Sequence, residues 1–282
     1  MTPRTAVLTL ARGRHQHLLG QVAGLSRGSR APDLHLIVAM GDPQLAGGAV
    51  PVGTDRWETL VRPLDVAGSD LPLAAARNLA ARSAIDAGAQ VLVFLDVDCI
   101  PGQDLVRTYA DVVAAGGSDR PALWCGDVGY LPAAGPDGYP PERLDALARP
   151  AGARPVLAPG ELMPEPRFEL FWSLSFAVSA ADFTVTGGFC TDYLGYGGED
   201  TDFAQLVRAA GGSLTWVGGA TAYHQHHDSI VPPVQHRRAV VRNANVFHDR
   251  WGWWPMQGWL DAFAAQGLAE RQGADGRWVV TG

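Results

Sequence analysis

The chain has 282 residues, of which 47% are hydrophobic and 18% are charged, and its formal net charge is −7 at pH 7. This composition is typical of a folded globular protein and excludes an intrinsically disordered chain. The acidic balance argues against nucleic acid as the main partner, since binding a phosphate backbone requires clustered Lys and Arg. No run approaches the roughly 20 apolar residues that span a bilayer, so no transmembrane segment is expected.

The three cysteines, Cys99, Cys125 and Cys190, are scattered along the chain. Their odd number and wide spacing argue against a disulfide framework and against a zinc site built from cysteines. The N-terminus becomes polar too soon for a signal peptide. We therefore expect a cytoplasmic protein with reduced thiols.

The first part of the chain alternates strand-like apolar runs with helical patterns. Strands are predicted at residues 5–10, 34–40 and 91–95, and helices at residues 18–22 and 73–87. The last of these strands is wholly apolar, which is typical of a strand buried on both faces of a parallel sheet. The alternation predicts an α/β protein with an open, mostly parallel sheet flanked by helices.

From residue 131 to 166 the chain becomes rich in Pro and Gly, and only residues 142–148 have a helical pattern. A long irregular segment inside a compact domain is usually a functional loop or lid. Regular patterns then resume, with a strand predicted at 168–178, a helix at 201–210 and a strand at 214–223. No internal repeat is present.

The most informative segment is 187–202, an acidic cluster on a glycine-rich turn just before a helical pattern. Glu199, Asp200 and Asp202 fall at or beside the helix start, where a carboxylate caps free amide groups and is favoured by the helix dipole. Capping requires one carboxylate and no glycines, whereas glycines let a backbone approach something closely. The surplus of acids and glycines therefore predicts a ligand site as well as a cap.

A second acidic pair, Asp96 and Asp98, follows the apolar strand 91–95. In open α/β sheets, ligands bind beyond the carboxyl ends of the strands. Residues two apart in an extended backbone point to the same side, so these two carboxylates are expected to converge on one ligand. Hard oxygen donors suit Mg²⁺ or Mn²⁺. The alternative is an ordinary turn at the strand end, since Asp, Pro and Gly all favour turns.

Taken together, these motifs resemble those of a GT-A glycosyltransferase of the family 2 type, in the branch of the β-1,4-galactosyltransferases and the bacterial chondroitin polymerases. The resemblance spans residues 5–230. Four motifs carry it: Asp96-Val97-Asp98, Gly187-Gly188-Phe189, Gly195-Tyr196-Gly197-Gly198-Glu199-Asp200-Thr201-Asp202, and Ala222-Tyr223-His224-Gln225. In that branch a Trp usually stands where this chain has Tyr196, which keeps an aromatic wall on the acceptor side.

The resemblance implies a GT-A, Rossmann-like fold with a C-terminal helical extension. Residues 1–230 form the catalytic domain, in which 1–115 are the nucleotide-binding half and 167–230 the acceptor and base half. Residues 131–166 form an irregular loop on the acceptor side. Residues 231–282 are expected to pack on the same domain as an extension.

The resemblance also implies a metal site. Asp98 holds a divalent ion, Mn²⁺ or Mg²⁺, which binds the diphosphate of the donor. Asp96 lies beside Asp98 at the donor, and His224 is a further metal ligand. A lone histidine is more often structural or solvated. In the sequence Tyr-His-Gln-His-His, however, His226 lies on the same side as His224 if the strand continues, and it is the second choice.

For catalysis, the resemblance implies that Asp200 is the general base that deprotonates the acceptor hydroxyl, and that Glu199 holds acceptor hydroxyl groups. A base opposite the leaving group predicts inversion at the anomeric carbon, as in single-displacement glycosidases. The expected substrates are a nucleotide-diphosphate sugar, with UDP the favoured nucleotide, and a hydroxyl group of a glycan or small molecule.

The nucleotide contacts are placed at the ends of the first strands. Thr9, Arg12 and Arg14 follow the first strand, Asp42 follows the second, and Arg77 lies in an Ala-Arg-Asn helix start. Arg12 and Arg77 are favoured as direct contacts, although a surface Arg is usually just solvated.

Two other functions fit part of the pattern. A sugar-phosphate nucleotidyltransferase would have a glycine-rich phosphate loop near the N-terminus, for which Ala11-Arg12-Gly13-Arg14 is a poor substitute. A non-catalytic sugar-binding module would have no use for a general base. The Trp-rich segment 251–259 is expected mainly to close the core with an amphipathic helix, with one of its tryptophans or Trp172 at the acceptor site.

Overall fold

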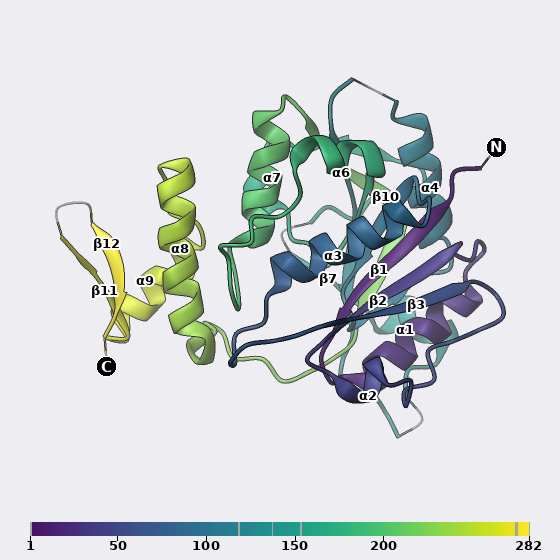
Figure 1. Cartoon of the computed structure of the whole chain (residues 1–282), viewed down its shortest axis with the longest axis horizontal. Coiled ribbons are helices and arrows are strands. Elements are labelled where there is room, and N and C mark those ends of the chain that lie inside the picture. Colours follow the sequence, from purple (N-terminus) through teal and green to yellow (C-terminus); the bar gives the residue numbers. More distant parts are fainter. Residues whose placement is uncertain (1, 118, 137, 153, 274–275, 282) are drawn as a thin grey trace.

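The computed structural model describes residues 2–117, 119–136, 138–152, 154–273 and 276–281. These residues form one large mixed sheet with helices on both faces, and a smaller C-terminal unit beside it (Figure 1). The main order of strands in the large sheet is β3-β2-β1-β4-β9-β6-β10-β5, with β7 and β8 paired to its second half. The predicted α/β fold class is confirmed.

The first half of the sheet is parallel, as expected. Its strands are β1 (Thr5–Ala11), β2 (Leu34–Met40), β3 (Glu58–Leu64) and β4 (Val91–Leu95), and its helices are α1 (His15–Arg27), α2 (Pro43–Ala46) and α3 (Leu73–Asp86). The predicted strands β1, β2 and β4 are almost completely buried. Strand β3 was not predicted, because it lies at the sheet edge and none of its residues is fully buried.

The second half of the sheet is mixed rather than mostly parallel. It contains β5 (Cys99–Pro101), α4 (Leu105–Ala115), β6 (Ala122–Tyr130), β9 (Ser175–Ser179), α6 (Ala180–Thr186), α7 (Glu199–Ala209) and β10 (Ser213–His224). Strand β9 runs antiparallel to both β4 and β6, whereas β10 runs parallel to β6. This arrangement places the end of β10 near the segment that follows β4, and Arg77 connects that segment to the start of α7.

The strand predicted at 168–178 is shorter than expected. Residues Phe168–Leu170 form a 3₁₀ turn, η2, and the strand begins only at Ser175. The reason is that the intervening backbone bonds to other groups: the Trp172 carbonyl accepts from Arg154, and the Leu174 carbonyl accepts from the Asp96 amide. This segment therefore serves as a support for the region after β4 instead of extending the sheet.

The irregular segment 131–166 is tied to the sheet edge. It contains η1 (Pro141–Arg143), α5 (Leu144–Leu147), β7 (Arg149–Pro150) and β8 (Leu162–Pro164). Strand β7 pairs with β6, and β8 pairs with β10, so the middle and the end of the segment lie along the second half of the sheet. Residues 137 and 153 lie outside the described residues.

Helices on both faces bury the alternating side chains of the strands. Leu8, Phe94 and Phe176 face the layer of α3, α6 and α7, whereas their neighbours in sequence face α1 and α4. The Phe94 and Phe176 rings stack with centroids 4.6 Å apart, and the Phe189 and Phe203 rings with centroids 4.2 Å apart. Phe94 and Phe203 belong to β4 and α7, the two elements that adjoin the acidic motifs.

The Gly187-Gly188-Phe189 turn is held by a side chain of α3. Asn78 accepts a hydrogen bond from the Phe189 amide at 2.8 Å and donates one to the Phe189 carbonyl at 2.7 Å. Gly188 has φ +77°, and a Cβ atom there would lie 2.6 Å from the Asn78 carboxamide oxygen. Only glycine fits this close approach.

The C-terminal unit consists of η3 (Val234–His236), α8 (Arg237–Trp251), α9 (Gln257–Ala265) and a hairpin of β11 (Ala269–Gln272) and β12 (Arg277–Val280). Figure 1 shows these elements, in yellow-green to yellow, beside α7. They have their own small core, which includes Val240, Leu260, Phe263 and Trp278. The hairpin was not predicted. Among the described residues, no helix combines the length and the apolar character needed to cross a bilayer.

The fully buried carboxylate of Asp202 anchors this unit to α7. It accepts hydrogen bonds from Arg250 Nε at 2.6 Å, Trp251 Nε1 at 2.7 Å and the Tyr193 hydroxyl at 3.1 Å. From the sequence, Asp202 was expected only at the helix start. Its side chain in fact joins α7 to the last turn of α8, because a buried charge must find such partners.

Replacing Asp202 with Ala is expected to destabilise the protein by about 3 kcal/mol, because it leaves several buried donors unpaired and creates a small cavity. Urea unfolding followed by circular dichroism would measure the loss. Asp261→Ala, an exposed acid on α9 that bonds Gln257, is the matched control and should change the free energy of unfolding by less than about 0.5 kcal/mol. Equal effects of the two substitutions would contradict the anchoring role.

Candidate functional site

The acidic motif after β4 and the histidine motif at the end of β10 lie side by side. Strand β5 pairs antiparallel with the end of β10, so that Cys99 lies opposite His224. The Gln225 amide also donates to the Asp98 carbonyl at 2.7 Å. Backbone pairing therefore fixes His224 next to Asp98.

Three side chains form a group whose geometry fits a metal ion. One ligand atom from each of Asp98, His224 and His227 lies within 4.8 Å of the others. His224 Nε2 lies 3.6 Å from Asp98 Oδ1, and His227 Nε2 lies 3.5 Å from Asp98 Oδ2. Within the described part of the chain, the buried Asp98 Oδ1 has no hydrogen-bond partner, which is the state expected of an oxygen available to a cation.

The third member of the group is His227 and not His226, which the strand pattern made the second choice after His224. Strand β10 ends at His224, so the alternation of side chains no longer applies beyond it. The His226 side chain is exposed, whereas His227 turns back toward Asp98.

The charge of Asp98 is stabilised by its surroundings. Burial alone would raise the pKa of this carboxyl, but the contact with His227 and the charges of His224 and Arg14 hold the pKa below its usual value. An ionised carboxylate with two imidazoles is a mixed oxygen and nitrogen donor set. Imidazole nitrogen suits first-row transition metals better than Mg²⁺, so the residues fit Mn²⁺ better than Mg²⁺.

Arg14 is the basic residue that the structure brings to this group. Its guanidinium forms an ion pair with Asp98. Arg14 stands at the start of α1 with φ +51°, a left-handed conformation that is uncommon for a residue other than glycine. Arg12, the residue favoured from the sequence as a direct nucleotide contact, is exposed.

Thr9, which was predicted to contact the nucleotide, has a side chain that bonds other buried groups of the protein. Thr9 lies inside β1 and is fully buried. Its hydroxyl donates to Gln21 Oε1 at 2.8 Å and lies 3.2 Å from His35 Nε2. The residue is therefore part of a polar contact between β1, α1 and β2.

Asp42 braces the loop that follows β1. Its carboxylate accepts hydrogen bonds from the Gly13 amide at 2.8 Å and the Leu45 amide at 3.1 Å, and it lies 2.8 Å from His15 Nε2. Burial opposes ionisation, but these contacts together lower the pKa of Asp42 below its usual value. Any role of Asp42 toward a nucleotide is therefore shared with holding the segment that carries Arg12 and Arg14.

Arg77 connects the two acidic motifs. It is almost fully buried, and it donates to Glu199 Oε1 at 2.9 Å and to Ser173 Oγ at 2.7 Å. Its guanidinium also lies 3.9 Å from Asp96 Oδ1. These partners are all side chains of the protein, whereas Arg77 was expected to contact the nucleotide. No sequence pattern indicated that Ser173 takes part.

The carboxyl groups of Asp96 and Asp200 have perturbed pKa values. Burial raises the pKa of Asp200 to about 6, repulsion by Glu199 adds to the rise, and Arg77 opposes it. Burial also raises the pKa of Asp96 to about 7, although Arg77 again acts in the opposite direction. Perturbed carboxyl groups gathered around one arginine are typical of a functional site.

The glycine-rich turn before α7 is shaped by contacts with the chain itself. Gly195, Gly197 and Gly198 have φ values of +70°, +94° and +94°. A Cβ atom at Gly197 would lie 2.6 Å from Met256 Sδ, and one at Gly198 would lie 3.1 Å from Tyr193. The close approach that the glycines permit is thus to the C-terminal unit and to Tyr193.

Exposed aromatic side chains surround the acidic residues. Tyr196 is 42% exposed, Tyr130 is 38% exposed, and Trp172 is 37% exposed. The Tyr130 ring lies 4.9 Å from the His224 ring, and Trp172 immediately precedes Ser173. Exposed aromatic faces beside carboxylates are well suited to packing against sugar rings.

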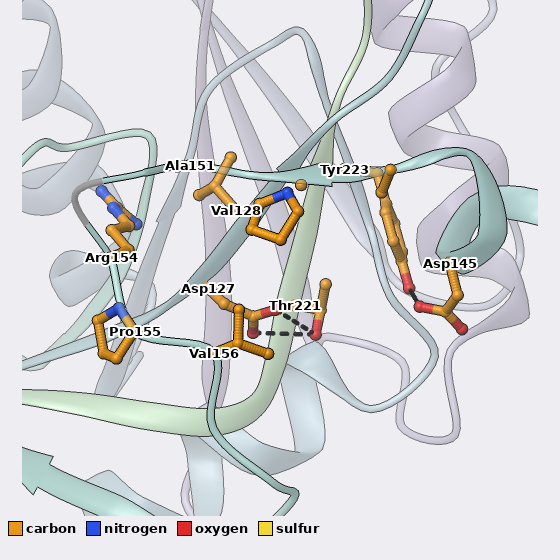
Figure 2. A pocket seen from close by; sticks show the side chains of 12 residues that line it. Asp127, Val128, Asp145, Ala151, Arg154, Pro155, Val156, Thr221 and Tyr223 are labelled. Carbon is orange, nitrogen blue, oxygen red and sulfur yellow. Dashed lines mark hydrogen bonds between the residues drawn. The ribbon is translucent and has the colours of Figure 1, made fainter.

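A separate pocket of about 140 Å³ lies against β6 and β10 (Figure 2). In it the Thr221 hydroxyl bonds Asp127, and the Tyr223 hydroxyl bonds Asp145. Arg154 lines the same pocket and donates to the Trp172 carbonyl at 2.6 Å. Asp98, His224 and His227 do not line this pocket, so the pocket is distinct from the site around Asp98 and Asp200.

Comparisons with known proteins agree with this arrangement. The family model described as the N-terminal domain of galactosyltransferase matches residues 160–228, which include the acidic turn and His224. No curated protein matches the sequence.

Two solved structures resemble the chain in fold. S. aureus TarS (residues 1–349) has a TM-score of 0.59 at 12% identity, with 86% of this chain and 64% of that chain covered. GalNAc-T7, solved with UDP, GalNAc and Mn²⁺, has a TM-score of 0.54 at 17% identity, with 94% of this chain and 57% of that chain covered. The chain thus spans less than two thirds of the length of either structure. The matched segment and the shared fold support a glycosyltransferase of GT-A fold.

Proposed function

We propose that the protein is a metal-dependent, inverting glycosyltransferase that moves a sugar from a UDP-sugar to a hydroxyl group of a glycan or small molecule. The observation that carries the proposal is the bridge formed by Arg77. Arg77 pairs with Asp96, which lies two residues before Asp98, and with Glu199. Glu199 is next to Asp200, whose carboxyl group has a raised pKa. A site for a diphosphate and a site for an acceptor hydroxyl are therefore adjacent.

Asp98, His224 and His227 hold the divalent ion, with Asp96 beside them. When bound, such an ion neutralises charge that develops on the diphosphate leaving group. Arg14, already paired with Asp98, lies where it can bind the same diphosphate. The structure of GalNAc-T7 with UDP and Mn²⁺ supports this choice of donor and metal.

Asp200 is the general base. The acceptor oxygen attacks the anomeric carbon, the bond from that carbon to the diphosphate oxygen breaks, and Asp200 takes the acceptor's proton. A carboxyl with pKa about 6 is ionised at neutral pH yet basic enough to accept a proton as the oxygen attacks. A single displacement with the base opposite the leaving group gives inversion.

Glu199 and the aromatic side chains bind the acceptor. Arg77 occupies one oxygen of the Glu199 carboxylate, and the other, Oε2, is buried without a partner among the described residues. A buried unpaired oxygen is suited to accept a hydrogen bond from an acceptor hydroxyl. Tyr196 and Trp172 supply the aromatic faces.

The proposal is tested by incubating the protein with a panel of nucleotide sugars and sugar acceptors, with and without Mn²⁺, and measuring released nucleoside diphosphate. We expect release with a UDP-sugar and Mn²⁺, and little release without metal. A sugar-phosphate nucleotidyltransferase would instead form pyrophosphate from a nucleoside triphosphate. A non-catalytic module would bind a sugar and release no nucleotide from any donor.

The rate of transfer is expected to rise with pH and to level off above a midpoint near pH 6. The pKa of Asp200 is raised to about 6, so its proton-accepting form is lost as the pH falls through that value. Initial rates from about pH 5 to pH 8, at saturating Mn²⁺ and substrates, would measure the midpoint. A flat profile over this range would contradict the assignment of Asp200.

A further inference from the structure

Asn243 on α8 is fully buried and contacts the backbone of the glycine-rich turn before α7. Its side-chain nitrogen lies 3.0 Å from the Leu194 carbonyl oxygen, 2.8 Å from that of Gly197, and 3.4 Å from that of Tyr196. A carboxamide has two N–H donors, so the two short contacts account for both. One side chain thus bridges the two ends of the segment 194–197.

Other side chains of the C-terminal unit contact the same segment. Arg242 donates to the Leu194 carbonyl and pairs with Asp70. The Tyr196 ring stacks against His236, with centroids 5.0 Å apart, and against Trp259, with centroids 5.7 Å apart. The C-terminal unit thus contacts this turn through hydrogen bonds to its backbone and through ring contacts with Tyr196.

The turn requires such support because its own backbone offers little. Three glycines with positive φ give it a large loss of conformational entropy on ordering. Its contact with the rest of the catalytic domain includes the hydrogen bond from the Gly195 amide to the Leu71 carbonyl. Asp200 lies two residues beyond Gly198, so the direction of its carboxylate depends on how this turn is held.

We propose that Asn243 is a positioning residue, which fixes the Gly-Tyr-Gly-Gly turn so that Glu199 and Asp200 meet the acceptor. The C-terminal unit then helps to form the acceptor side of the site, because it holds the turn that precedes Glu199 and Asp200. This inference rests on the proposed function, but Asn243 itself lies outside residues 160–228, the segment that the galactosyltransferase model matches.

Asn243→Ala is expected to lower kcat by about 10- to 100-fold and to raise the KM for the acceptor, because small displacements of a reacting group are costly. The Kd of UDP with Mn²⁺ should stay within about threefold of wild type, since the side chains paired with Asp98 are Arg14, His224 and His227, none of which belongs to this turn. If the alanine protein does not fold, Asn243→Ser keeps one donor and is expected to show the same split with a smaller loss.

Asn245→Ala is the matched control. Asn245 lies on the same helix and also bridges backbone groups, but it bonds the Trp278 amide and carbonyl in the hairpin, away from the turn. It should lower the melting temperature as Asn243→Ala does, with kcat near wild type. If both variants lowered kcat in proportion to their loss of stability, or if Asn243→Ala left kcat and the acceptor KM unchanged, the positioning role would be wrong.

Amide hydrogen exchange separates this inference from the proposed function. Asn243→Ala should speed exchange in residues 192–200 by about tenfold, and Asn245→Ala should not. If wild type transferred no sugar but exchange changed in this way, the proposed function would be wrong, and Asn243 would still be the residue that holds the turn. If exchange stayed unchanged in an active protein, only the positioning role of Asn243 would be wrong.

Discussion

Replacing Asp200 with Asn is expected to lower kcat by about 10²- to 10⁴-fold, the contribution typical of a general base. The substitution keeps the size of the side chain and removes its ability to accept the acceptor's proton. UDP and Mn²⁺ should bind as in wild type, because Asp200 is not part of the group formed by Asp98, His224 and His227. Steady-state rates and calorimetric titration with UDP would measure the two quantities.

Asp192→Asn is the matched control for this substitution. Asp192 is an exposed acid on the same loop, and it should keep wild-type kcat. Wild-type turnover in Asp200→Asn would contradict its role as the base. A loss of UDP binding in the same variant would show that the acid acts on the donor instead.

Replacing Asp98 with Ala is expected to weaken Mn²⁺ binding by at least about 100-fold and to abolish measurable transfer. Even residues that only support a metal ligand typically contribute 10- to 100-fold to metal affinity. Asp98 is the carboxylate that both histidines and Arg14 approach. Titration with Mn²⁺ followed by electron paramagnetic resonance would measure binding without any need for turnover.

Two neighbouring histidines provide the internal comparison for the metal site. His227→Ala should weaken Mn²⁺ binding, because His227 Nε2 faces Asp98, and His226→Ala should leave it unchanged, because His226 is exposed. Equal Mn²⁺ affinity in wild type and Asp98→Ala would overturn the site. A larger effect of His226→Ala than of His227→Ala would reassign the third ligand.

The elements that could be predicted from the sequence are those whose pattern reflects burial alone. Strands β1, β2 and β4 are continuous apolar runs inside a parallel sheet, and their predicted bounds agree with the structure within one residue. Strand β6 was not identified because Gly126, Asp127 and Gly129 interrupt its apolar pattern. Those glycines are required by close neighbours, since a Cβ atom at Gly126 would lie 1.9 Å from the Ala220 carbonyl oxygen.

The candidate site was predicted where its residues adjoin regular elements. Asp96, Asp98 and His224 follow or end strands, and the structure brings Asp98 and His224 together. His227 could not be chosen over His226, because the strand ends at His224 and the backbone then changes direction. The contacts of Arg77 and Asn243 with the acidic turn span 122 and about 46 to 49 residues of sequence, and local patterns carry no information on such contacts.

The most direct test compares wild type, Asp98→Ala and Asp200→Asn in one assay of nucleoside diphosphate release, with a UDP-sugar, an acceptor and Mn²⁺. We expect acceptor-dependent release by wild type alone, with UDP and Mn²⁺ still binding to Asp200→Asn but not to Asp98→Ala. Equal release by all three proteins, or no release by wild type with any donor and acceptor, would contradict it.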